Sequence, residues 1–248
     1  MIDTHCHLTQ IPSSQLTSIL ATLEALKLLA VSTTLEDSKS TLGLAKSYPI
    51  YPAVGLHPWF LSDSEELIKK ALNQLERMIA ADLNSIKAIG EIGLDYSPKV
   101  QIRQTLQREA FAFQLRLAQQ FALPVSIHGV KSHPDLQKLL KTYSTVKGAL
   151  HGFYGSPELA HSYLKLGIKI GIGPMVLRQG PNKLHQVIKD VPIDGMVLET
   201  DFPNTRQYGI NHPKDIQKVA EKVAEIKQMP VALVQSICDQ TAKELFLL

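Results

Sequence analysis

Six side chains that can bind a divalent cation follow short apolar runs of the sequence. They are His5, His7, Glu91, His128, His151 and Asp201. His5 and His7 are two residues apart, so in an extended strand both imidazoles project from one face, with Cys6 on the other. Imidazole nitrogens and carboxylate oxygens are common ligands of divalent metals. A lone histidine at a strand end is usually a satisfied polar residue, so a metal site requires a fold that brings the six together.

The apolar runs alternate with helical patterns along the whole chain. Eight runs rich in β-branched residues predict strands buried on both faces, as in a parallel sheet. They span residues 1–5, 28–33, 50–56, 86–92, 124–128, 146–151, 168–172 and 195–199. One strand and one helix in every 31 residues or so is the spacing of a single-domain (β/α)8 TIM barrel, an α/β fold of about 250 residues. A doubly wound open sheet is the competing architecture, but the chain has no glycine-rich dinucleotide fingerprint.

A TIM barrel would bring the six side chains to one face, because the carboxyl ends of all its strands meet there. The fold therefore predicts a two-metal site at that face. Glu91 is long enough to bridge two ions, and Asp201 is placed to bind one ion and accept a proton from water, which makes both candidate catalytic residues. Capping of the following helix is the alternative role of Asp201. Asp3, Asp95 and Glu199 are expected to lie behind the ligands and orient their imidazoles.

Composition narrows the class of protein. The chain has 248 residues, 44% hydrophobic and 20% charged, which predicts one globular domain over residues 1–248 and excludes a disordered chain. Its two cysteines, Cys6 and Cys238, exclude a disulfide scaffold and a cysteine-only zinc module. The net charge of +3 is too small to indicate a nucleic-acid partner by itself. We find no secretory signal and no apolar run of about 18 residues, so we expect a cytoplasmic protein with no membrane partner.

Six short motifs follow one another along the chain. They are Ile2-Asp3-Thr4-His5-Cys6-His7, Gly55-Leu56-His57-Pro58-Trp59, Gly90-Glu91-Ile92-Gly93-Leu94-Asp95, Leu123-Pro124-Val125-Ser126-Ile127-His128, His151-Gly152-Phe153 and Leu198-Glu199-Thr200-Asp201. Together they resemble the TatD family of metal-dependent deoxyribonucleases, within the amidohydrolase-like barrels. The set covers nearly the whole chain, and its order is specific although no single motif is. The resemblance implies one metal on His5, His7 and Asp201, a second on His128 and His151, and Glu91 between them.

The sequence departs from the family pattern at three places. Gly129 and Val130 stand where the family usually has Ser-Arg, and Ile210 replaces an arginine. The loop at residues 171–175 lacks the usual small polar residue. We expect these positions to contact the substrate.

The resemblance and the predicted site together imply hydrolysis of phosphodiester bonds in DNA. The substrate would be single-stranded DNA or DNA ends, cut as by a 3'-5' exonuclease, and the enzyme would act as a monomer with two divalent ions (Mg²⁺, Mn²⁺ or Zn²⁺). His57 and Trp59 are expected to contact the sugar or stack on a base. Lys131, Arg178 and Arg206 follow three of the predicted strands and are candidates for phosphate contacts.

Two other functions fit the same residues. The metal ligands would polarise a carbonyl as readily as a phosphoryl group, so a binuclear amidohydrolase or esterase acting on a small amide, ester or lactone is the first alternative. Against it, no lysine stands at a strand end to bridge the ions, and Glu91 takes that position. The second alternative is a metal-binding interaction protein without activity, in which replacement of Asp201 would leave the cellular role unchanged.

Overall fold

The computed structural model describes residues 1–21, 23, 26–180 and 182–248. Its eight parallel strands form one sheet in the order of the sequence, β1 beside β2 and so on to β8. The strands are β1 (Ile2–Cys6), β2 (Lys27–Val31), β3 (Tyr51–Val54), β4 (Ala88–Asp95), β5 (Val125–Val130), β6 (Gly148–Leu150), β7 (Ile168–Ile172) and β8 (Met196–Leu198). Each overlaps a run that the sequence predicts as a strand.

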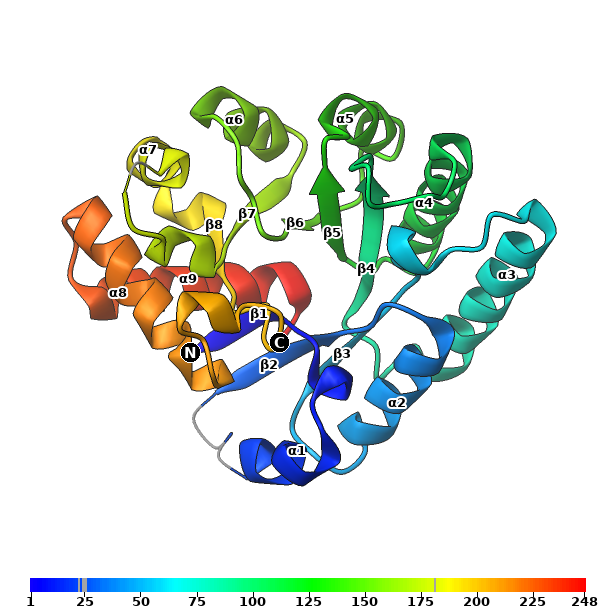
Figure 1. Cartoon of the computed structure of the whole chain (residues 1–248), viewed down its shortest axis with the longest axis horizontal. Coiled ribbons are helices and arrows are strands. Elements are labelled where there is room, and N and C mark those ends of the chain that lie inside the picture. The colour runs from blue at the N-terminus through cyan, green and yellow to red at the C-terminus, as the bar shows by residue number, and fades with distance from the viewer. Residues whose placement is uncertain (22, 24–25, 181) are drawn as a thin grey trace.

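Helices surround the sheet on its outer face (Figure 1). They are α1 (Ser13–Leu20), α2 (Leu35–Ala45), α3 (Glu65–Asp82), α4 (Gln104–Gln120), α5 (His133–Thr142), α6 (Pro157–Lys165), α7 (Lys183–Asp190), α8 (Ile216–Lys227) and α9 (Val231–Phe246). Short 3-10 turns lie in the connections, among them η1 (Leu8–Gln10), η3 (Pro58–Phe60), η4 (Pro174–Leu177), η5 (Ile193–Gly195), η6 (Arg206–Tyr208) and η7 (Pro213–Asp215). Local sequence sets where two helices begin: Ser64 caps α3, and Ser156 caps α6 with Pro157 in its first turn.

Hydrogen bonds join β1 and the residue after it to the end of β8 and the segment that follows it, so the sheet forms a nearly closed barrel. The Thr4 hydroxyl donates to the Leu198 carbonyl over 2.9 Å. Beyond the end of β8, the Asp201 N–H donates to the His5 carbonyl and the His7 N–H to the Phe202 carbonyl, both over 2.8 Å. The predicted TIM barrel is therefore confirmed, and the open doubly wound sheet is wrong.

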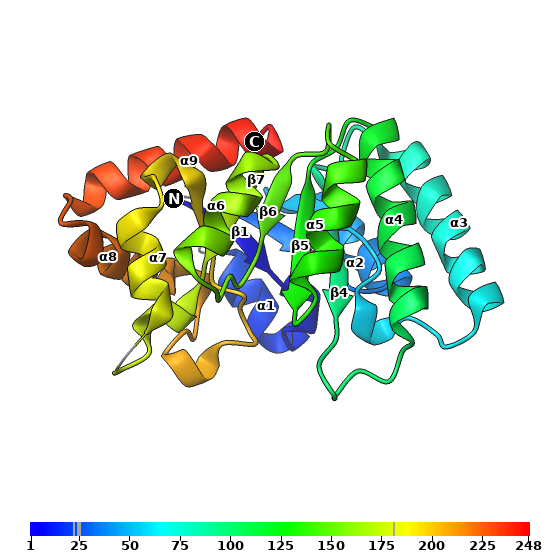
Figure 2. The same ribbon diagram turned by 90° about the horizontal axis from the view of Figure 1, so that it is seen from above.

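The barrel interior is narrow and is filled from one end by the last helix. Its buried cluster consists of Ile2, Leu29, Val31, Ala53, Ala88, Ala149, Val197, Ala242 and Phe246. Three of the seven strand residues in this cluster are alanines, and the fully buried Phe246 ring from α9 packs with them. Figure 2 shows α9 across the end where β1 begins, opposite the long loops that follow β4 and β8.

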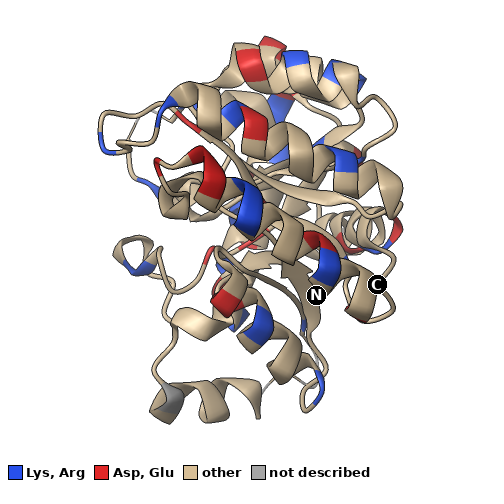
Figure 3. Ribbon diagram, turned by 90° about the vertical axis from the view of Figure 1, so that its right-hand side faces the viewer, with Lys and Arg blue, Asp and Glu red and all other residues tan. Residues whose placement is uncertain are grey.

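Basic and acidic residues are interspersed along the outer helices (Figure 3). Within the described ranges, no helix is long and apolar enough to cross a membrane. Several buried ionisable side chains lie instead toward the carboxyl ends of the strands, among them His5, Glu91 and Glu199.

We expect the change Phe246→Ala to lower the free energy of unfolding by about 3–5 kcal/mol, because it leaves a cavity in a closed barrel that cannot collapse. Phe246→Leu retains most of the buried volume and should cost clearly less. Denaturant unfolding measures both. The change Leu233→Ala on the exposed face of the same helix is the control, with an expected effect within about 0.5 kcal/mol. Equal losses at positions 246 and 233 would show that Phe246 does not hold the barrel end.

Candidate metal centre

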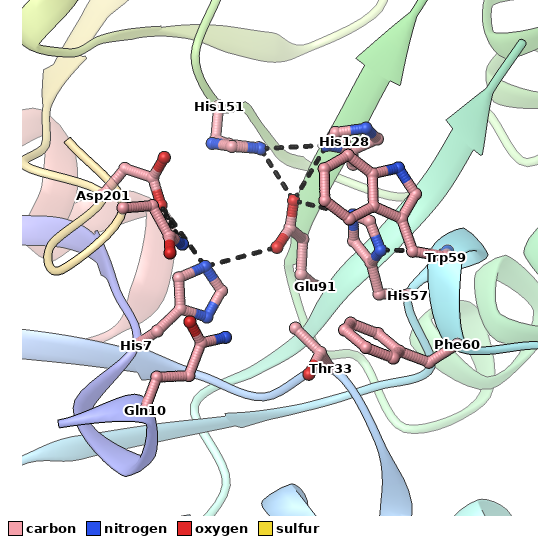
Figure 4. Close-up of a pocket in the computed structure, with 11 residues that line it drawn as sticks. His7, Gln10, Thr33, His57, Trp59, Phe60, Glu91, His128, His151 and Asp201 are labelled. Atoms are coloured by element: carbon pink, nitrogen blue, oxygen red, sulfur yellow. Dashed lines mark hydrogen bonds and ion pairs between the residues drawn. The ribbon is translucent and has the colours of Figure 1, made fainter. Parts of the chain in front are cut away.

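The barrel brings the predicted metal ligands together, and Figure 4 shows the five of them that line one cleft. The cleft has a volume of about 330 Å³. Its lining includes five of the six, together with Gln10, Thr33, His57, Trp59, Phe60 and Asn204. The sixth, His5, lies fully buried behind His7, with its Nε2 3.2 Å from the His7 Nε2.

The Glu91 carboxylate lies between two pairs of imidazoles. Its Oε1 is 2.7 Å from His151 Nε2 and 3.1 Å from His128 Nδ1. Its Oε2 is 3.5 Å from the Nε2 atoms of both His5 and His7. Each carboxylate oxygen thus faces a different pair of ring nitrogens, which is the arrangement that a bridging ligand requires.

Asp201 completes the His5 and His7 side of the cleft. Its Oδ1 lies 3.4 Å from His7 Nε2. One possible ligand atom from each of His5, His7 and Asp201 lies within 4.8 Å of the other two. The Asp201 backbone is in the left-handed region, with φ of 49°, and its N–H donates to the His5 carbonyl. The hydrogen bond that closes the barrel therefore also holds the carboxylate of Asp201 beside the two histidines.

Neighbouring groups fix which ring nitrogen of two histidines carries the proton. The His7 Nδ1–H donates to the Val31 carbonyl over 3.2 Å, because a carbonyl can only accept. The His128 Nε2–H donates to Asp95 Oδ2 over 3.0 Å. In the neutral rings, the lone pairs are thus on His7 Nε2 and His128 Nδ1, the two atoms that face Glu91. This donor set fits a divalent metal, which needs deprotonated nitrogens and an ionised carboxylate.

In His57, unlike in His7 and His128, the ring nitrogen that faces Glu91 carries the proton. The Trp59 backbone N–H donates to His57 Nδ1 over 3.1 Å, so the neutral ring carries its proton on Nε2. That nitrogen is 3.4 Å from Glu91 Oε1 and points into the cleft as a hydrogen-bond donor. Distance alone groups His57 with Glu91 and His128 as possible ligands, but the proton placement makes His57 a donor.

Opposite charges keep the two central carboxylates ionised. Burial by itself would raise the pKa of Glu91, but the imidazoles of His57, His151 and His5 hold this pKa well below its usual value. Burial likewise opposes ionisation of Asp201, but a proton on His7 Nε2, which would donate to the Asp201 carboxylate, lowers its pKa. Burial disfavours a charged His151, yet the Glu91 carboxylate raises its pKa to about 10. Binding of a metal at the His151 nitrogen would therefore release a proton.

The three carboxylates expected behind the ligands have different partners. Asp95 accepts from His128 and, over 2.7 Å, from the Trp59 indole N–H, so it orients both rings. Glu199 Oε1 is 3.8 Å from His151 Nδ1, and Glu199 Oε2 and that nitrogen are buried with no hydrogen-bond partner within the described residues. Asp3 accepts instead from the backbone N–H groups of His5 and Thr200 and does not contact an imidazole.

Sequence analysis missed the group that contacts the His5 ring. The Ser126 hydroxyl lies 2.9 Å from His5 Nδ1, and Ser126 is two residues before His128 on β5. The period of two in a strand places Ser126 on the same face as His128, and this signal was available in the sequence. Phe60 was missed as well, although it lines the cleft beside Trp59.

The structure does not bring the three predicted phosphate-binding cations into the cleft. Lys131, Arg178 and Arg206 are exposed, and none of them lines it. Arg206 instead donates to Gln15 Oε1 over 3.4 Å. Its guanidinium also lies over the Phe202 ring.

The departures from the family pattern lie in different surroundings. Ile210 is fully buried in the hydrophobic core, so it packs and does not meet a ligand. Gly129 and Val130 are half-buried at the end of β5, outside the cleft lining.

We expect Asp95→Asn to weaken metal binding by about 10–100-fold, because the neutral amide orients the His128 ring less firmly than the carboxylate does. Calorimetric titration of the metal-free protein with Zn²⁺ or Mn²⁺ measures the change. The matched control is Asp190→Asn, which removes a carboxylate 2.7 Å from His161 at the surface and should leave the affinity unaltered. Equal affinities in both variants would mean that Asp95 does not act on the metal ligands.

Comparison with known proteins relates this site to a family. Residues 2–247 match the family described as TatD related DNase. YjjV, an uncharacterized metal-dependent hydrolase of Escherichia coli K12, is 32% identical in sequence, over 97% of this chain and 95% of its own. The crystal structure of YjjV superposes on this chain with a TM-score of 0.91 and 30% identity, and the match covers 100% of this chain and 98% of that one. Human deoxyribonuclease TATDN3 is 28% identical over 99% of this chain and 94% of its own, and the 3'-5' ssDNA/RNA exonuclease TatD of Edwardsiella piscicida is 28% identical over 88% and 87%. This chain thus belongs to the TatD related DNase family of metal-dependent hydrolases.

Proposed function

We propose that this protein is a 3'-5' exodeoxyribonuclease that binds two divalent metal ions in the cleft around Glu91. The observation that carries the proposal is the position of the Glu91 carboxylate, whose two oxygens face separate pairs of ring nitrogens. His5, His7 and Asp201 would hold one ion, and His128 and His151 the other, with Glu91 shared. The names of the human and Edwardsiella relatives support DNA as the substrate class.

Each remaining group in the cleft has a role that follows from its position. Bound ions would supply Lewis acidity, which lowers the pKa of an attacking water and neutralises charge on the phosphoryl oxygens. Asp201 is ionised and stands at the edge of the cleft, so its carboxylate can accept the proton of that water. His57 presents its Nε2–H to the cleft and can donate to a phosphate oxygen. Trp59 and Phe60 expose their rings at the lip, where a base can stack.

Metal identity, quaternary state and compartment belong to the same proposal. Mixed nitrogen and oxygen ligands are compatible with Mg²⁺, Mn²⁺ or Zn²⁺. We propose a monomer that acts as one domain over residues 1–248 in the cytoplasm. The two free cysteines, Cys6 and Cys238, are both buried, which suits a reducing compartment.

Cleavage of end-labelled single-stranded DNA tests the activity. We expect the wild-type protein to shorten the strand from its 3' end with Mg²⁺ or Mn²⁺ and to leave it intact with EDTA. Glu91→Gln and Asp201→Asn should each lower the rate by about 10²–10⁴-fold, because each loses an ionised group beside the reacting atoms. Asp190→Asn is the control for a remote carboxylate.

Metal titration of the wild-type protein and the same variants distinguishes a wrong substrate assignment from a wrong metal arrangement. If the wild-type protein binds two ions and leaves DNA intact, the substrate assignment is wrong, and small amides, esters and lactones become the substrates to screen. If it cleaves DNA with one ion bound, or with its rate unchanged by Glu91→Gln, the bridged two-metal arrangement is wrong.

We expect Phe60→Ala to raise KM for single-stranded DNA by about 5–100-fold with little change in kcat, since stacking on an aromatic ring stabilises binding of a base in the ground state and transition state alike. Phe60 is a cleaner target than Trp59, whose indole also donates to Asp95. Steady-state kinetics measure the change, and Tyr154→Ala, an exposed aromatic residue outside the cleft lining, is the control. A fall in kcat at constant KM would contradict a stacking role.

A further inference from the structure

A second cavity of about 250 Å³ adjoins the metal cleft on the side of β6, β7 and β8. The two spaces share three lining residues, His151, Asp201 and Asn204. A ligand bound at Glu91 can therefore extend directly from the cleft into this side pocket. Asn204 stands in the shared wall, where its amide donates to Asp201 Oδ1 over 3.2 Å.

The side pocket has both polar and apolar walls, with the Glu199 and Asp201 carboxylates on one side and apolar or aromatic side chains on the other. Phe153 and Leu184 are buried, and Met175 and Tyr208 are half-buried around the same space. The pocket is smaller than the roughly 300–1,000 Å³ that encloses a drug-sized ligand, and this size suits one planar ring system.

Two polar side chains at the pocket, the exposed Gln207 and the half-buried Tyr208, are placed to meet a ligand. The Gln207 amide and the Tyr208 hydroxyl make no hydrogen bond within the described part of the chain. An amide offers two donors and one acceptor side by side, the pattern with which glutamine reads the edge of a base. Both residues lie on η6, which follows β8 and so sits on the catalytic face of the barrel.

The side pocket lies on the opposite side of Glu91 from the exposed aromatic pair. In Figure 4, His151 and Asp201 are to one side of the Glu91 carboxylate, and Trp59 and Phe60 are to the other. A strand whose phosphate sits at Glu91 would therefore place one neighbouring base toward Trp59 and Phe60 and the other toward the side pocket.

We propose that the side pocket binds the nucleobase of the terminal nucleotide next to the scissile phosphate, with the Tyr208 ring against the base and the Gln207 amide at its edge. This inference rests on the proposed nuclease function. The volume of the side pocket suits a single base, which favours the base of a terminal nucleotide as its occupant.

Binding of two probes to the metal-loaded protein tests the pocket without catalysis. Deoxyadenosine 5'-monophosphate and deoxyribose 5-phosphate share the phosphate and sugar and differ in the base. We expect the wild-type protein to bind the first more tightly by about 5–150-fold in calorimetric titration, the range for stacking of one base. Tyr208→Ala should remove most of this difference, Tyr208→Phe should keep it, and Gln207→Ala should reduce it. Tyr154→Ala is the matched control, since Tyr154 is exposed and lines neither cavity.

The outcomes separate this proposal from the proposed nuclease activity. Equal affinity of the two probes for the wild-type protein would overturn the pocket assignment, whether or not DNA is cleaved. A difference that survives Tyr208→Ala but is lost in Phe60→Ala would place the base at the lip of the cleft and also overturn it. Loss of the difference in Tyr208→Ala alone supports the pocket, and cleavage of labelled DNA then reports separately on the activity.

Discussion

Glu91 is only 3% exposed, and burial of an ionised carboxylate costs several kcal/mol unless opposite charges or hydrogen bonds compensate for it. Here the compensation comes from imidazoles on four different strands or the loops after them: His5 in β1 and His7 just after it, His57 after β3, His128 on β5 and His151 after β6. All of these imidazoles reach Glu91 from elements other than β4, which carries it. The carboxylate and the imidazoles therefore stabilise one another only when the barrel is assembled, and together they leave a set of lone pairs that a cation can use.

Closure of the barrel supplies the second constraint. The strand ends would carry the same residues in an open sheet, but His7 and Asp201, 194 positions apart along the chain, would then lie on opposite edges. The hydrogen bonds that join β1 to the end of β8 run through the backbone of His5, His7 and Asp201 themselves. The same bonds thus complete the sheet and bring the two halves of one ligand group together.

The two ends of the barrel have different roles: one is packed with apolar side chains and the other carries the candidate metal ligands. At the packed end, Phe246 lies in a buried apolar cluster with strand residues such as Ala53, Ala88 and Ala149. At the other end the strands finish in polar groups, two of which, His151 Nδ1 and Glu199 Oε2, are buried without a partner among the described residues. Unpaired buried polar atoms lower the stability of the folded state. Burial of apolar side chains at the opposite end of the barrel offsets this loss. The loops after β3 and β8 then add the aromatic lip and the side pocket around the metal ligands.

The sequence by itself determined the order of the strands and the identity of the candidate ligands, because β-branched runs, their spacing and the residue types at their ends are local properties. Tertiary structure decided what each side chain meets. The Trp59 backbone N–H donates to His57 Nδ1, which makes the other nitrogen of this ring a donor. The His5 ring contacts the Ser126 hydroxyl, and Asp3 accepts from backbone N–H groups. Lys131, Arg178 and Arg206 lie outside the cleft lining. A sequence pattern states which face a residue occupies, but the partner of a side chain depends on distances between elements far apart in the chain, and these exist only once the barrel has closed.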